Sequence, residues 1–139
     1  MNDHKEPLSL ATYTAQTGLS HQWILAGVLL VGWLQGESAL FSQAAIPTAG
    51  LVVGLVVMVQ VALFEPDKTE QRQLNILEMV GIGLPLAFGL DYALRSSLAA
   101  WPPALQLAAG FLFNVAFIAL GAPLSVLRRR LLGSRDREE

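Results

Sequence analysis

The chain has 139 residues, of which 53% are hydrophobic and only 14% are charged. Soluble domains carry about 25% charged residues, so this composition favours an integral membrane protein over a soluble domain. The formal net charge is −2, and the absence of cysteine excludes disulfides, thiolate metal sites and cysteine nucleophiles.

Residues 1–20 are predicted to form a cytoplasmic or interfacial arm before the first membrane span. Its first seven residues are polar with charges of both signs, and the stretch that follows is uncharged and rich in Ser, Thr and Ala. A cleaved signal peptide is not expected, because the start is not basic and the first apolar run comes late and leads into further spans.

The first predicted span covers residues 22–41. The apolar run that starts at Trp23 is too short for about 30 Å of hydrocarbon, so a helix must extend it. Forward extension brings Glu37 near the outer end and leaves Trp23 at the inner interface, where indole rings are common. Backward extension would instead include Thr17 and Gln22. We expect the forward extension.

The second predicted span covers residues 46–64, with Pro47 in the first helical turn, where its missing N–H costs nothing. The valine-rich middle would favour a strand in water, but in lipid the backbone must satisfy itself, so a helix is expected. Gly50 and Gly54 form a GxxxG pattern, which lets another helix approach closely. The partner helix could belong to this chain or to another subunit.

The third predicted span covers residues 74–94. Gly81, Pro85 and Gly89 share one face at helical spacing and are expected to pack against a helix. Pro85 lacks an N–H and is expected to free a backbone carbonyl near Gly81. The result is a glycine-rich, proline-broken helix.

Glu78 lies on the same face of the third span. Carboxylates inside a membrane are functional candidates, so Glu78 is a candidate for ion or proton transport. The structural alternative is that Glu78 reaches the cytoplasmic interface or pairs with Arg72 or Arg128.

Two further carboxylates lie toward the outer ends of predicted spans. Asp91 precedes Arg95 by four residues, so a local ion pair is the first interpretation. Glu37 and Asp91 could instead approach each other, and one of them would then hold a proton. Both are retained as transport candidates.

The fourth predicted span covers residues 103–127. Gly110, Asn114 and Gly121 fall on one face at helical spacing and are expected to pack against a helix. Asn114 lies near the bilayer centre, where an amide is costly unless it is hydrogen-bonded. It is interpreted as an interhelical hydrogen-bonding residue or, alternatively, as a ligand for a substrate or ion.

The basic residues set the predicted orientation. Only Arg95 flanks one side of the four-span arrangement, and the other eight flank the opposite side: Lys5, Lys68, Arg72, Arg128, Arg129, Arg130, Arg135 and Arg137. The positive-inside rule then places both termini in the cytoplasm. Residues 128–139 form a basic tail, in which Arg128, Arg129 and Arg130 are expected to contact anionic lipid.

Catalytic and metal-binding patterns are absent from the sequence. It contains no nucleophile elbow, zinc-protease motif or phosphate-binding loop, and its two histidines have no partner at metal spacing. The basic surface is too small for nucleic-acid binding. No enzyme activity, metal, cofactor or nucleic-acid partner is therefore expected.

The sequence as a whole predicts an all-α, four-helix transmembrane bundle over residues 21–127, with both termini inside. The expected location is a bacterial inner membrane. The expected function is that of a small non-enzymatic accessory or structural subunit of a membrane assembly, or a homo-oligomer. The alternative is a small oligomeric ion- or proton-coupled transporter or channel, including a holin-like pore former.

Overall fold

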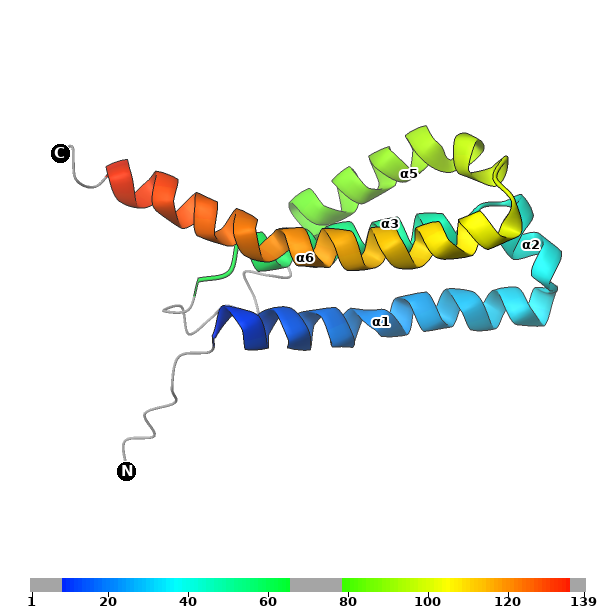
Figure 1. The fold of residues 1–139 in the computed structure, drawn as a ribbon, viewed down its shortest axis with the longest axis horizontal. Coiled ribbons are helices and arrows are strands. Elements are labelled where there is room, and N and C mark those ends of the chain that lie inside the picture. Colours follow the sequence, from blue (N-terminus) through cyan, green and yellow to red (C-terminus); the bar gives the residue numbers. More distant parts are fainter. Residues whose placement is uncertain (1–8, 66–78, 136–139) are drawn as a thin grey trace, which may run out of the picture.

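The computed structural model describes residues 9–65 and 79–135, so Glu78 and the polar loop before it lie outside the described residues. Every regular element in the described ranges is helical, which confirms the all-α class. The elements in chain order are α1 (Leu10–Gln35), α2 (Glu37–Ser42), α3 (Ala45–Ala62), η1 (Met79–Gly83), α5 (Leu84–Ala99) and α6 (Pro103–Arg135) (Figure 1).

Helix α1 differs from the predicted first span at both of its ends. It begins at Leu10, because the Ser9 hydroxyl accepts the Thr12 N–H at 3.2 Å and caps the first turn. It ends at Gln35, because Gly36 has a φ of 101°, which favours glycine and breaks the helix. The expected forward extension to residue 41 is therefore wrong. The helix extends backward, through part of the predicted arm, and α2 is a separate element.

Helix α3 lies at the centre of the bundle. Of its residues, 72% are buried, against 22% in the apolar 18-residue stretches of α1 and α6 that are candidate membrane spans. Helices α1, α5 and α6 all pack against it, with the most extensive contact made by α6. Pro47 lies in its first turn, as expected.

The contacts fix the helix directions. Tyr13, in the first turn of α1, stacks on Phe64, with ring centroids 4.3 Å apart, so α1 runs antiparallel to α3. Gly83 lies beside Val56 and Val59, so η1 and α5 also run antiparallel to α3. Helix α6 runs parallel to α3, because Gly110 meets Ile46 near one end and Gly121 meets Val61 near the other.

The bundle therefore has two distinct ends. At the loop end lie the connections at residues 36–44 and 100–102 (Figure 1). At the opposite end, here the terminal end, lie the start of α1, the end of α3, the start of η1 and the C-terminal part of α6 (Figure 1).

Within residues 9–65 and 79–135, three helices are long and apolar enough to cross a membrane: α1, α3 and the part of α6 from Pro103 to Gly133. Helix α5 is shorter, but η1 continues it backward, so helical backbone runs from Met79 to Ala99. The π-helical turn of η1 precedes Pro85, whose missing N–H removes an α-helical hydrogen bond at this point.

Helix α6 is longer than the predicted fourth span. Its 33 residues rise about 50 Å, more than the roughly 30 Å of a hydrocarbon core. Pro123 lies inside the helix without ending it, and the helix continues to Arg135. The predicted tail therefore begins as helix rather than as a loose segment.

Candidate functional site

Glycines form the seam between α3 and α6. A Cβ atom on Gly50 would overlap the carbonyl oxygen of Gly110, and one on Gly54 would lie 3.0 Å from the Phe113 carbonyl oxygen. On the other side of the seam, a Cβ on Gly121 would lie 2.8 Å from the Cβ of Val61. The two backbones approach so closely that larger side chains do not fit, which is the role of small residues in membrane helices.

The glycines of the third predicted span lie elsewhere. Added Cβ atoms on Gly81 and Gly89 would have no neighbour within 4 Å among the described residues, and Pro85 is exposed. Helix α5 instead packs on α3 through Gly83 and Ala87, a face roughly 200° round the helix from Pro85. The expected packing of Gly81, Pro85 and Gly89 is therefore not formed within this part of the chain.

Asn114 joins α6 to α1. Its Oδ1 accepts a hydrogen bond from Gln22 Nε2 at 3.0 Å, and Gln22 Nε2 also donates to the Gly18 carbonyl at 3.2 Å. The Asn114 residue is 4% exposed, yet its Nδ2 is buried without an acceptor. The structure thus places Asn114 in an interhelical hydrogen bond and leaves its amide nitrogen available.

A groove of about 660 Å³ runs between α1 and α6 past this pair. We call it the α1–α6 groove, lined by Ala11, Ala15, Gly18, Gln22, Asn114 and Ala122, among others. Most lining residues are apolar and many are small, so the groove has the width and chemistry of a surface on which a further helix could pack.

Asp91 and Arg95 form the ion pair that their spacing predicts. Arg95 Nη2 donates to Asp91 Oδ2 at 2.7 Å, with the Asp91 side chain 9% exposed and the Arg95 side chain 57% exposed. Asp91 Oδ1 is buried and accepts no hydrogen bond from the part of the chain that the structure describes. Glu37 is exposed in the first turn of α2, and no ion pair joins it to Asp91 among the described residues.

Two adjoining cavities of about 280 and 650 Å³ lie beside this ion pair. Gln43, Phe88, Asp91 and Arg95 line both of them, and we call the two cavities together the loop-end groove. Helices α1 and α5 form its walls and α3 its floor.

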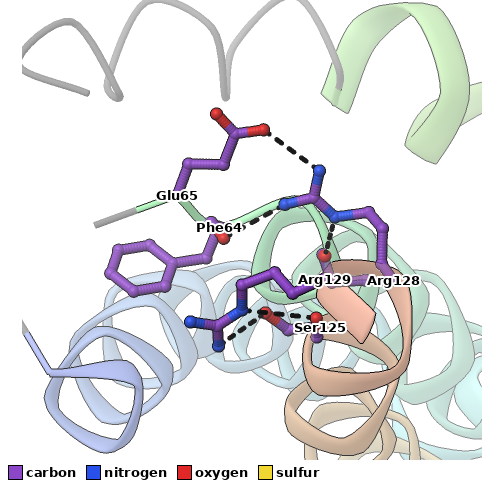
Figure 2. Close-up of polar contacts among 6 residues, drawn as sticks. Phe64, Glu65, Ser125, Arg128 and Arg129 are labelled. Carbon is purple, nitrogen blue, oxygen red and sulfur yellow. Dashed lines mark hydrogen bonds and ion pairs between the residues drawn. The ribbon is translucent and has the colours of Figure 1, made fainter. Parts of the chain in front are cut away.

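Arg128 has a structural role that the charge pattern did not predict. Its Nε donates to the Ala62 carbonyl at 3.0 Å, and its Nη2 donates to the Phe64 carbonyl at 3.2 Å (Figure 2). Its Nη1 contacts Glu65 Oε1 at 3.0 Å. Arg128 thus caps the C-terminus of α3, where terminal carbonyls and the helix dipole favour a cation.

The other two arginines of the cluster differ from Arg128. Arg129 donates to the carbonyl and hydroxyl oxygens of Ser125, one turn earlier in its own helix, at 3.4 and 3.3 Å (Figure 2). Arg130 is exposed. Arg129 is exposed as well, and contact with anionic lipid stays a prediction for the three arginines.

Two glutamines that make hydrogen bonds within the fold, Gln22 and Gln106, were missed in the sequence. Gln22 was noticed only as part of a possible helix extension, and Gln106, which is 1% exposed, was not singled out. Gln106 Nε2 donates to the Trp101 carbonyl at 2.9 Å and so braces the turn between α5 and α6. The argument applied to Asn114, that an amide in a membrane needs a partner, would have found both.

Comparison with known proteins gives no guide to function. No family model, no characterised protein and no solved structure matches the chain. Among the residues that the structure describes, no group of three or more His, Asp or Glu side chains is placed to hold a metal ion. The features of the fold that bear on function are the two grooves and the glycine seam.

Proposed function

We propose that the protein is a small, non-enzymatic integral membrane protein that crosses the membrane four times and acts as an accessory or structural subunit of a membrane assembly. A further transmembrane helix, from a second copy or from another subunit, packs in the α1–α6 groove. The observation that carries this proposal is the buried Asn114 Nδ2, which has no acceptor within the described residues.

A membrane location is supported by large apolar side chains on the outside of the bundle. Trp23 on α1 is 80% exposed, and Leu112 and Val115 on α6 are 66% and 64% exposed. Exposed apolar surface on this scale marks a membrane or protein contact. Since three helices are also long enough to cross a bilayer, lipid is the environment that suits these side chains.

The proposed orientation places the terminal end in the cytoplasm. Four crossings bring both chain ends to one side, in keeping with the helix directions. Eight of the nine basic residues belong to that side by sequence, and only Arg95 lies toward the loop end. The positive-inside rule assigns the basic side to the cytoplasm.

Asn114 supplies the reason for a partner helix rather than lipid alone. Acyl chains offer no acceptor for its Nδ2, and a buried donor without a partner costs about 1–3 kcal/mol. A helix in the α1–α6 groove could offer a hydroxyl, amide or carbonyl oxygen, and Ala15 and Gly18 would let it come close.

Native mass measurement in mild detergent tests the proposal, using membranes treated with a crosslinker before extraction. The parent is expected to run as an oligomer or with a second protein, and Ala15→Leu, which fills the groove, is expected to release it as a monomer. Ala26→Leu is the matched control, because Ala26 is exposed on α1 but does not line the groove. A parent chain that remains a monomer throughout would sink the proposal.

A small oligomeric ion- or proton-coupled transporter or channel is the second candidate, favoured by the buried, unpaired Oδ1 of Asp91 beside a groove. In that case the purified protein alone drives flux in liposomes, and Glu78→Gln or Asp91→Asn abolishes it without loss of insertion. Absence of flux from the parent protein excludes this candidate.

A further inference from the structure

The loop-end groove holds a carboxylate with unused bonding capacity. Asp91 is more than nine-tenths buried, and one of its two oxygens is taken by Arg95. The other, Oδ1, is buried and has no hydrogen-bond donor among the described residues, and Asp91 lines the groove. Because an ionised carboxylate accepts up to about four hydrogen bonds, this oxygen requires a donor, most favourably a charged one.

Arg95 offers the opposite chemistry at the mouth of the groove. It donates through Nη2 to Asp91, and its side chain remains 57% exposed. A guanidinium carries five N–H donors in a planar fork that suits phosphate oxygens. A ligand that carries both a cationic donor and an anionic acceptor would therefore meet complementary groups, Asp91 and Arg95, on adjacent turns of α5.

Depth along the bundle separates the polar mouth from an apolar interior. Arg95 and Asp91 lie four and eight residues before the end of α5, which is about 6 and 12 Å below that end. Ser42 and Ser96 lie at the mouth. Val28 and Val52 lie at about the depth of Asp91, and Ile24 and Phe88 line the deepest, apolar part. A ligand with a charged head and an apolar chain matches this division.

We propose that the loop-end groove binds one phospholipid whose headgroup carries a primary ammonium and a phosphate, as in phosphatidylethanolamine. The ammonium donates to Asp91 Oδ1, the phosphate accepts from Arg95, and an acyl chain lies along Val28 and Val52. The headgroup's two-carbon link between nitrogen and phosphate oxygen is short enough for both contacts to be made on neighbouring turns. The ion pair is then a recognition site as well as a structural bond.

Headgroup chemistry makes the proposal selective. A choline headgroup has no N–H and cannot donate to Asp91, although its phosphate can still reach Arg95. A glycerol headgroup carries no cation. The inference rests on the proposed membrane location but not on the partner helix, because the groove lies between α1 and α5 rather than α1 and α6.

Native mass spectrometry of the delipidated protein tests the site, with dioleoyl lipids that differ only in headgroup. Phosphatidylethanolamine is expected to be retained about tenfold better than phosphatidylcholine, the ratio that a charge-assisted hydrogen bond supports. Asp91→Asn is expected to remove this preference. Arg95→Gln is expected to weaken phosphatidylethanolamine and phosphatidylglycerol alike, because both offer a phosphate.

A second pair of variants keeps the test decisive if Asp91→Asn folds poorly, as judged by helix content. Val28→Trp fills the groove without replacing either member of the ion pair and is expected to lower retention of phosphatidylethanolamine. Leu112→Trp is the matched control, since Leu112 is exposed on α6 and lines neither groove. Glycerophosphoethanolamine, the water-soluble headgroup, should not displace the lipid at equal concentration; if it does, the lipid assignment is wrong.

Three further results overturn the proposal. They are equal retention of phosphatidylethanolamine and phosphatidylcholine, an unchanged preference in well-folded Asp91→Asn, and unchanged binding in Val28→Trp. None of them depends on the oligomeric state, so the lipid site and the subunit role fail independently.

Discussion

Helices α3 and α6 have much the same apolar character and very different surroundings. The candidate span in α3 is 72% buried and that in α6 is 22% buried, although both are long and apolar enough to cross a membrane. Hydrophobicity alone therefore does not tell a helix that faces protein from one that faces lipid. The sizes of the side chains and their positions around the helix distinguish the two kinds of helix.

Side-chain size differs around the two helices. Helix α3 is composed mainly of Gly, Ala and Val, so three neighbours can approach it closely from different sides. Helix α6 has a small and polar stripe that is buried, Gly110, Asn114, Gly121 and Ser125, and most of its larger apolar side chains are exposed. One helix is built to be surrounded by protein, the other to lie between protein and lipid.

Of the substitutions that test this contrast, Gly50→Leu should have the largest effect on the free energy of unfolding. The new side chain would overlap the backbone of Gly110, which cannot move without parting the two helices. We expect a loss of about 3 kcal/mol in the free energy of unfolding, the upper part of the range for overpacking. Gly81→Leu is the control, because Gly81 has open space around it. Similar losses in equilibrium unfolding of both variants would show that the seam is not formed.

Loss of the Arg128 cap should have the next largest effect. Arg128→Gln removes the charge from the C-terminus of α3 and breaks the pair with Glu65, for an expected cost of about 1–2 kcal/mol. Amide exchange should rise near Leu63 and Phe64, whereas Arg130→Gln should leave it unchanged. Equal exchange in both variants would contradict a specific cap.

Asn114→Leu should cost less, about 0.6–2 kcal/mol, because it removes one interhelical hydrogen bond with Gln22. Gln22→Leu should cost a similar amount, and the double variant should cost less than the two single losses together. Unfolding in detergent measures all three, and full additivity would show that the two amides act separately.

The smallest effect should come from the outer face of α6. Leu112→Ala deletes a side chain that is 66% exposed, and lipid can fill the space, so we expect less than about 0.5 kcal/mol. Val57→Ala in α3 deletes fewer atoms from a fully buried site and should cost more. The reverse order would remove the distinction between the two helices.

The helical class and most apolar segments could be predicted from composition and run length, but helix ends could not. The end of α1 depends on the φ of Gly36, and glycine in a membrane helix has no fixed conformation from sequence. Its backward extension is tolerated because polar side chains bond locally: Thr14 donates to the Leu10 carbonyl at 2.7 Å, and Ser20 to the Thr17 carbonyl at 3.0 Å. Such local bonds are not visible in a hydropathy pattern.

Prediction of the sites was uneven for a related reason. The Asp91–Arg95 pair follows from spacing along one helix and was predicted. The contacts of Asn114 with Gln22 and of Arg128 with the end of α3 join residues far apart in the sequence, so they require the helix directions. Contacts within one helix could be predicted from the sequence, and contacts between helices could not.

The parallel seam between α3 and α6 has a consequence for biosynthesis. Gly50 is made about 60 residues before Gly110, which at 5–20 residues per second is an interval of about 3–12 s. During that time α3 is already long enough to enter the bilayer, while the helix that covers its glycines does not yet exist. The glycine face of the nascent protein must meanwhile lie against lipid or against the insertion machinery, and the bundle closes only when its last helix arrives.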